Sequence, residues 1–230
     1  MRHLLSFLES SLGRKYIMAL TGLFLCVFLV EHLYGNLLLY KQDAGAAFIE
    51  YSHDMVHSIL IRIVEIILFV AIVIHVLQAL DLTRRNSKAR PIKYAVNKSD
   101  ETSSWFSRNM GITGSIILFF LVVHLRQFFI PYRITDTVGA AGQPDVAMAV
   151  KEAFENPYYS LLYVISSVIL GFHLNHGFQS AFQSLGVNNK KYAPILKNMG
   201  TGFAIIIVLG FGSFPILFYF HLAGKFIILN

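Results

Sequence analysis

The sequence predicts an all-α integral membrane protein, a bundle of five transmembrane helices. Of the 230 residues, 55% are hydrophobic and 14% are charged, whereas soluble domains usually carry about a quarter charged residues. The apolar residues gather into runs that are long enough to cross the roughly 30 Å hydrocarbon core of a bilayer as helices. We therefore interpret residues 1–230 as a single transmembrane domain. The predicted spans are 16–40, 58–82, 108–131, 158–185 and 199–223.

Basic residues are concentrated in the N-terminal tail and in every second segment between the spans. These parts of the chain lie on one side of the membrane, so the distribution of charge predicts the topology. The 41–57 and 132–157 segments, which connect spans on the other side, carry three basic residues and seven acidic ones. By the positive-inside rule, the N-terminus is cytoplasmic and the C-terminus lies outside. The net charge of +6 thus reflects topology rather than nucleic-acid binding. Thirteen of the 19 basic residues lie on the cytoplasmic side: Arg2, Arg14, Lys15, Arg84, Arg85, Lys88, Arg90, Lys93, Lys98, Arg108, Lys190, Lys191 and Lys197.

The segments between the spans contain few structural signals. We interpret residues 41–57 as an outer loop. After Pro144, the stretch DVAMAVKEAFEN has helical periodicity and predicts a short amphipathic helix, which Asn156-Pro157 ends before span four. No cleavable signal peptide is expected, because the first apolar run is too long and too interrupted for a signal core. The single cysteine, Cys26, lies inside span one, so the chain offers no internal disulfide.

Spans one and three contain a parallel repeat. Residues 21–33 and 113–125 share Thr, Gly, Phe, Leu, Val, His and Leu at an offset of 92 residues. In a helix, each histidine lies roughly 15 Å along the axis from its Thr-Gly pair. Two spans that run the same way would therefore hold His32 and His124 at one depth. Two imidazoles that face each other inside a helix bundle can ligate one haem iron from both sides.

Five histidines lie well inside spans one to four, and ionisable residues at such depth usually have a function. Spans one and three run outward and place His32 and His124 in an outer layer. Spans two and four run inward and place His75, with His173 or His176, nearer the cytoplasmic face. Histidine pairs without carboxylates or thiolates favour bis-imidazole haem over a zinc or di-iron site. For any one histidine, the alternative is a hydrogen bond between helices.

The side of span four that carries His173 is lined by small residues, whereas the side that carries His176 is lined by larger ones. A flat macrocycle needs room against the helix, so His173 is the expected ligand, although small residues also serve close helix packing. His176 is expected to bond a haem propionate or a neighbouring helix. The small residues are Ser166, Gly177, Ser180 and Ser184, and the larger ones are Ile165, Ile169, Phe172 and Gln183.

Charged residues near span two allow more than one interpretation. Arg84 and Arg85 follow the span and can reach haem propionates, because arginine binds carboxylates bidentately. Membrane-surface charge is the alternative role, and the two are compatible. Near the other end of the span, Arg62 and Glu65 are three residues apart and are expected to neutralise each other.

Several stretches of the chain resemble one known family. They are SSLGRKYIMALTGLFL, FLVEHLYGN around His32, IHVLQAL around His75, SSWFSRNMGITG through VVHL at His124, and FHLNHGFQSAFQSLG in span four. With four histidines on consecutive helices, the chain resembles the single-chain, five-helix, dihaem cytochrome b membrane anchor of succinate dehydrogenase and fumarate reductase (complex II). In that family the span-four ligand precedes a glycine by four residues, here Gly177.

The resemblance implies two b haems and a location in the bacterial inner (cytoplasmic) membrane. It also implies a flavoprotein and an iron–sulfur subunit docked on the cytoplasmic face, with menaquinone as the membrane electron carrier. The chain would then be the quinone-reactive, non-dehydrogenase subunit of the enzyme, working in either direction, and the whole complex can be oligomeric.

The resemblance also suggests a carboxylate that handles protons for quinone. We assign this role to Glu50, because it precedes span two at a depth close to the outer histidine pair, although its spacing to span two does not match the family cleanly. Glu31, next to His32, is interpreted as a proton-handling group, as a group that supports the histidine, or as a partner of Arg126.

Two other functions remain as alternatives. One is a cytochrome b subunit of another membrane oxidoreductase, such as a hydrogenase or a formate dehydrogenase. The other is a transporter with a histidine relay for protons or metal ions. Transporters usually show inverted repeats or broken helices at mid-membrane. Here the repeat is parallel, and only Pro215 interrupts a span centrally.

Overall fold

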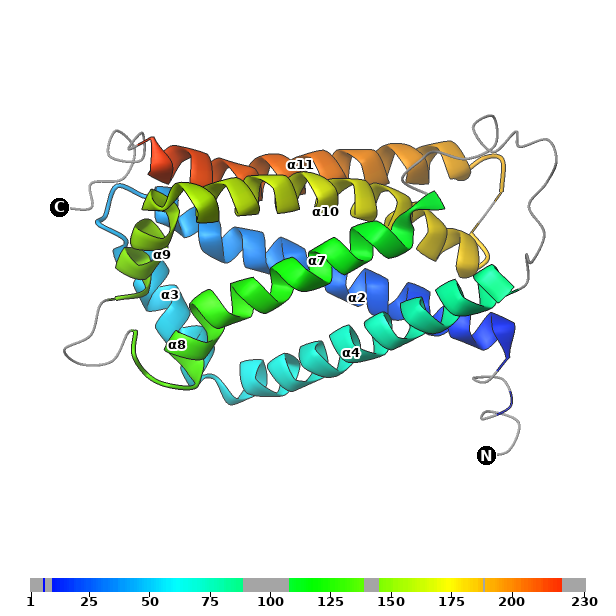
Figure 1. The fold of residues 1–230 in the computed structure, drawn as a ribbon, viewed down its shortest axis with the longest axis horizontal. Coiled ribbons are helices and arrows are strands. Elements are labelled where there is room, and N and C mark those ends of the chain that lie inside the picture. Colours follow the sequence, from blue (N-terminus) through cyan, green and yellow to red (C-terminus); the bar gives the residue numbers. More distant parts are fainter. Residues whose placement is uncertain (1–5, 7–9, 89–107, 139–144, 188, 221–230) are drawn as a thin grey trace. The chain divides into compact units, whose positions relative to one another are not determined.

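The computed structural model describes residues 6, 10–88, 108–138, 145–187 and 189–220, and these residues form helices and turns without any strand. Five helices are long and apolar enough to cross a membrane, as the sequence predicts (Figure 1). The cytoplasmic N-terminus stays a prediction from charge. The helices are α2 (Ser11–Leu37) with the 3₁₀ turn η1 (Leu38–Tyr40), α4 (Ile59–Lys88), α7 (Met110–His124) with η2 (Leu125–Phe129) and α8 (Ile130–Arg133), α10 (Pro157–Ser184) and α11 (Ala193–Tyr219).

Two of the long helices begin earlier than the apolar pattern predicts. Helix α2 starts at Ser11, where the Ser10 hydroxyl accepts the N–H of Gly13 at 3.0 Å. Helix α11 starts at Ala193, just after a turn in which the Asn189 amide oxygen accepts two backbone N–H groups. Such caps satisfy backbone donors that a helix start would otherwise leave unpaired. The predicted end of span five, residues 221–223, lies outside the described residues.

The interpretation of residues 41–57 as a loop is wrong, because they contain the helix α3 (Ala46–His57). The Asp43 carboxylate accepts the N–H groups of Gly45 and Ala47, and Ala44 and Gly45 turn the chain with φ values of 56° and 83°. None of the helix residues is fully buried. The Asp43 side chain, which caps the start of the helix, is the local sequence signal that marks it.

The predicted amphipathic helix is confirmed as α9 (Val146–Glu155). The Asp145 carboxylate caps it by accepting the N–H of Met148 at 2.7 Å. It ends at Asn156, and α10 begins at Pro157 as expected. In Figure 1, α9 lies beside α3. Its buried residues are Val146, Ala147, Val150, Ala153 and Phe154.

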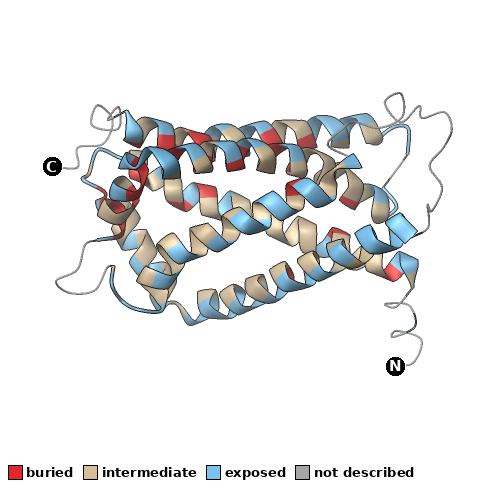
Figure 2. Ribbon diagram, viewed as in Figure 1, coloured by how far each residue is buried: buried red, intermediate tan, exposed pale blue. Residues whose placement is uncertain are grey.

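The long helices expose many apolar side chains (Figure 2). On α4, Ile59 is 83% exposed and Leu60 is 66% exposed, and Leu209 on α11 is 67% exposed. Contiguous apolar surface of this extent is rare on soluble monomers but suits contact with lipid chains. The structure therefore describes a multi-pass, all-helical membrane protein.

The residue contacts divide the chain into two compact units, to which each long helix contributes a segment. Unit 1 comprises Met1–Val27, Ile66–Ser115 and Phe172–Ala204. Unit 2 comprises Phe28–Glu65, Ile116–Gly171 and Ile205–Asn230. Each unit contains two of the four histidines that the sequence predicts as ligands.

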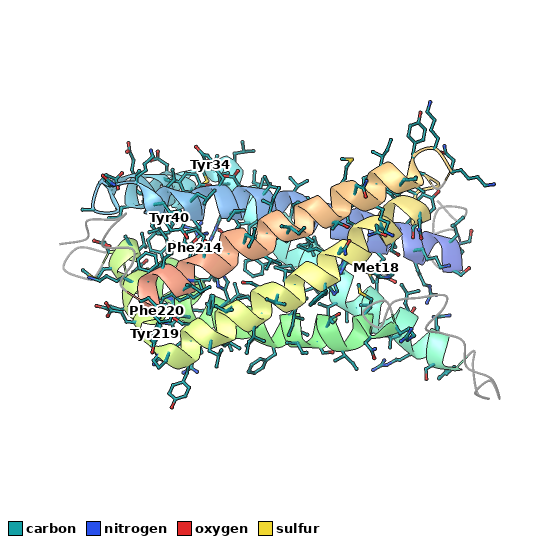
Figure 3. All side chains as sticks on the ribbon, turned by 90° about the horizontal axis from the view of Figure 1, so that it is seen from above. Met18, Tyr34, Tyr40, Phe214, Tyr219 and Phe220 are labelled. Carbon is teal, nitrogen blue, oxygen red and sulfur yellow. The ribbon has the colours of Figure 1, made fainter. Side chains whose placement is uncertain are left out.

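Close packing in unit 2 depends on glycines and aromatic rings. A methyl group at Gly210 of α11 would approach Leu33 Cδ1 of α2 to 2.7 Å, so the Leu33 side chain packs directly against the backbone of α11 at this glycine. Nearby, Tyr40 stacks on Phe214 with ring centroids 4.7 Å apart (Figure 3). The Tyr40 hydroxyl also lies 2.6 Å from Ser213 Oγ. These contacts join the end of α2 to α11.

Candidate functional site

In unit 2, His32 of α2 and His124 of α7 lie face to edge. Their ring centroids are 5.6 Å apart, and the ring planes meet at 87°. His32 also stacks on Phe28 at 5.3 Å and contacts the ring of Phe211 at 5.5 Å. The structure thus brings together the two histidines of the parallel repeat in an aromatic environment.

His124 makes a hydrogen bond that leaves one ring nitrogen available. Its Nδ1 lies 3.1 Å from the hydroxyl of Tyr163 on α10, a residue that is only 7% exposed. Phe120 and Phe128 contact the same imidazole. With Nδ1 engaged by Tyr163, the nitrogen left to bind a ligand is Nε2.

The helix that carries His124 widens immediately after it. Residues 125–129 form a π-helical turn in which the N–H of Ile130 bonds the carbonyl of Leu125. The cause lies at Pro131, which has no N–H and whose ring would clash with the carbonyl four residues earlier. Single π turns occur often at functional sites. This one sets where α8 begins beyond His124.

In unit 1, two histidines are each held by a threonine of a neighbouring helix. Nδ1 of His75 on α4 lies 3.1 Å from Thr21 Oγ1 on α2. Nδ1 of His173 on α10 lies 3.4 Å from Thr113 Oγ1 on α7. His75 and His173 both lie within the segments of unit 1. The structure thus places the predicted partners of the second pair in one unit.

The glycine after each threonine allows the imidazole to approach the helix. A methyl group at Gly22 would lie 3.3 Å from Cε1 of His75, and one at Gly114 would lie 3.6 Å from Cε1 of His173. The first distance is tight, whereas the second is an ordinary van der Waals contact. The Thr-Gly repeat therefore serves the histidine of the following membrane helix.

We expect Gly22→Ala to displace the His75 ring and to lower the thermal stability of the protein more than the matched variant Gly114→Ala, which faces His173. The added methyl group must push the His75 ring by a few tenths of an ångström, whereas the His173 ring already has room. The measurement is the thermal stability of the purified protein in detergent, with the absorption spectrum beside it. Equal effects of the two variants, or a larger effect at Gly114, would contradict this prediction.

The donor set fits haem better than a bare metal ion. Across the described residues, no group of three or more His, Cys, Asp or Glu side chains is placed to hold an ion. The predicted ligands among these residues are pairs of histidines, and a pair of histidines is the ligand set of a bis-histidine haem. Around Gly177, four residues after His173, a methyl group would meet nothing within 4 Å. Close helix packing therefore does not require a glycine at this position.

Two buried polar atoms lack a partner among the described residues. They are Oε1 of Gln78, three residues after His75, and Oγ of Ser166, seven residues before His173. A buried polar atom without a hydrogen bond costs about 1–3 kcal/mol. Such atoms mark places where a bound group or a water would complete the structure.

The arginines that follow span two are partly engaged by protein. Arg85 donates to both carboxylate oxygens of Asp81 at 3.0 and 2.9 Å, and Arg14 donates to the same carboxylate at 2.5 Å. Arg84 is exposed. His176, one turn beyond His173, is only partly buried. A role of Arg84, Arg85 and His176 toward haem propionates stays a prediction.

Glu50 is exposed on α3, and the next residue, Tyr51, makes a contact that the sequence analysis missed. The Tyr51 hydroxyl donates to the Glu31 carboxylate, so Glu31 pairs with Tyr51 rather than with Arg126. Burial raises the pKa of the Tyr51 hydroxyl, and the bond to Glu31 raises it further. A methyl group at Gly35 would lie 2.5 Å from the Tyr51 ring. That glycine is the one sequence signal for the contact.

Glu65 is neutralised by two arginines. The predicted pair is confirmed, because Arg62 Nη1 lies 2.9 Å from Glu65 Oε1. Arg133 Nε lies 3.2 Å from the other carboxylate oxygen and also binds the carbonyl of Val56 through Nη1. This cluster ties α4 to the end of α8 and to α3.

No protein-family model, curated protein or solved structure matches the chain. What the fold and the site define is a class: a multi-pass, all-helical membrane protein with paired histidines in its membrane-spanning helices.

Proposed function

We propose that the chain is the membrane-anchor and electron-transfer subunit of a succinate:quinone oxidoreductase in a bacterial inner membrane. In this proposal it carries electrons between an iron–sulfur subunit and menaquinone. Two b haems would be held by His32 with His124 and by His75 with His173. The observation that supports this most strongly is the distribution of the four histidines, two in each unit, on four consecutive membrane helices.

When bound, haem supplies reversible one-electron transfer at its iron. The protein supplies ligands and their surroundings. The Tyr163 hydroxyl contacts Nδ1 of His124. In the same way, Thr21 contacts Nδ1 of His75, and Thr113 contacts Nδ1 of His173. Phe28, Phe211 and the other rings around the unit 2 pair pack against the imidazoles. These contacts hold the rings in place and keep Nε2 free.

The proposed partners are the flavoprotein and the iron–sulfur subunit on the cytoplasmic face. Their docking is supported by the resemblance and by the basic residues at the end of α4 and in the segment that follows it, up to Arg108. Most of that segment, residues 89–107, lies outside the described residues. Glu50 is proposed as the acid that exchanges protons with quinone, since it is exposed and carries a carboxylate in the same unit as His32 and His124.

We expect two haems b per chain when the complex is purified in detergent. A pyridine haemochrome assay gives the number, and a dithionite-reduced minus oxidised spectrum gives the haem type. Two haems support the proposal, whereas a value near zero would contradict it. The same preparation should contain a flavoprotein and an iron–sulfur protein. A nickel or molybdenum subunit in their place would contradict the succinate part of the proposal.

A further inference from the structure

The hydroxyl of Thr21 has one proton, which it donates in a hydrogen bond to the backbone of α2. Thr21 Oγ1 donates to the carbonyl of Ile17 at 2.8 Å and lies 3.2 Å from that of Met18. A carbonyl can only accept, so the proton points toward these oxygens. While the proton serves one of these carbonyls, the hydroxyl oxygen can only accept a hydrogen bond from Nδ1 of His75.

Thr113 repeats this arrangement on α7. Its Oγ1 lies 3.1 Å from the carbonyl of Met110 and 3.5 Å from that of Asn109, so it too donates to its own helix. Its remaining contact is Nδ1 of His173. Thr113 is 4% exposed, so water does not compete for this bond. The two threonines come from the parallel repeat, 92 residues apart.

An acceptor opposite Nδ1 decides the tautomer of a neutral imidazole. One ring nitrogen carries the proton, and the hydrogen bond at one nitrogen determines what the other offers. With a hydroxyl oxygen at Nδ1, the proton stays on Nδ1, and Nε2 keeps its lone pair. A group that holds the far nitrogen also fixes the ring orientation and raises the basicity of the ligand.

We propose that Thr21 and Thr113 are positioning residues that fix His75 and His173 as Nδ1–H tautomers and present Nε2 as the ligating atom. The identity of the iron group at Nε2 rests on the proposed function, whereas the tautomer rests only on the contacts. The two residues of each Thr-Gly pair act together on one histidine. The threonine holds the imidazole, and the glycine lets the ring approach.

The chain offers a matched control on the same helix. Ser115, two residues after Thr113, also donates to a carbonyl four residues earlier, that of Gly111, at 2.8 Å. Its side chain is exposed. Replacing it removes the same kind of back-bond and leaves the histidines untouched.

The first experiment reads the tautomers without any cofactor. The full chain, labelled with ¹⁵N-histidine, is produced in a haem-deficient host and placed in lipid bilayers for solid-state NMR. We expect Nδ1–H signals for His75 and His173 in the wild type. Thr21→Val should convert the His75 signal to a mixture of tautomers, and Thr113→Val should do so for His173. The Ser variants at both positions should restore the wild-type signals, and Ser115→Ala should not change them.

The second experiment uses the assembled complex. Loss of a partner at the far nitrogen typically weakens binding of a ligated metal group about 10- to 100-fold. We expect each Val variant to lose one haem about tenfold more readily and to shift its redox potential upward, since the ligand becomes less basic. The haem of the other pair should be unchanged, and the Ser variants should behave as the wild type.

The outcomes separate the two proposals. Val variants with wild-type tautomers, or with the same behaviour as Ser115→Ala in both experiments, would overturn the positioning role. A wild-type complex without haem would overturn the proposed function. The loss of the Nδ1–H tautomer in the Val variants would support the threonine assignment even then.

Discussion

His173→Ala is expected to lower the haem content from two per chain to one, whereas His176→Ala should keep both. The structure places Thr113 at Nδ1 of His173 and Gly114 against its ring. His75, the other predicted ligand of this pair, lies in the same unit. His176 lies one turn away, with the same partial burial as His173. We therefore expect the ligand to be His173, the histidine that Thr113 of the neighbouring helix contacts.

The measurement is a redox titration of the purified complex followed at the haem absorption bands, together with the haemochrome value. The His173→Ala complex should show a single titrating haem with the properties of the remaining pair. At most, His176→Ala should shift one midpoint potential. Two haems in His173→Ala and one in His176→Ala would reverse the assignment of the ligand.

Glu50→Gln is expected to reduce quinone turnover by about 100-fold or more, because general acid–base catalysis typically contributes 10²- to 10⁴-fold. The amide keeps the size of the side chain but cannot take up or release a proton. Glu50 lies on α3, with an exposed side chain. The haem content should not change, and neither should succinate oxidation with an artificial electron acceptor, since both depend on other residues.

Glu152→Gln is the matched control, since Glu152 is an exposed carboxylate of the same unit on α9. It should leave quinone turnover unchanged. Wild-type turnover in Glu50→Gln would remove Glu50 from the quinone site. The carboxylate to test next would be Glu31, which is bonded to the neighbouring Tyr51.

The five long helices could be predicted from the sequence because each contains an apolar run of sufficient length. The starts of α2 and α11 could not, since the Ser10 and Asn189 contacts extend regular structure into polar residues. Helix α3 was missed for a related reason. It buries no residue completely, and its start depends on the Asp43 carboxylate.

The histidine pair of unit 2 could be predicted because the repeat places His32 and His124 at the same distance along two helices. When such helices run in the same direction across the membrane, their histidines lie at the same depth. The partners of the histidines could not be predicted. Thr21 and Thr113 recur with their histidines in the sequence, but each binds a histidine of a different helix. Tyr163 bonds His124 from α10 without any repeated pattern. Such contacts depend on how helices are rotated against one another, which local sequence does not determine.

The two threonine contacts have a consequence for how the chain inserts into a membrane. Each joins consecutive spans, α2 with α4 and α7 with α10, so each stabilises a helical hairpin. A hydrogen bond between helices in a bilayer contributes about 0.6–2 kcal/mol. A slip of one helical turn would move the partners about 5.4 Å apart along the axis and break the bond. We therefore expect each hairpin to select its own register on insertion, independently of the other hairpin.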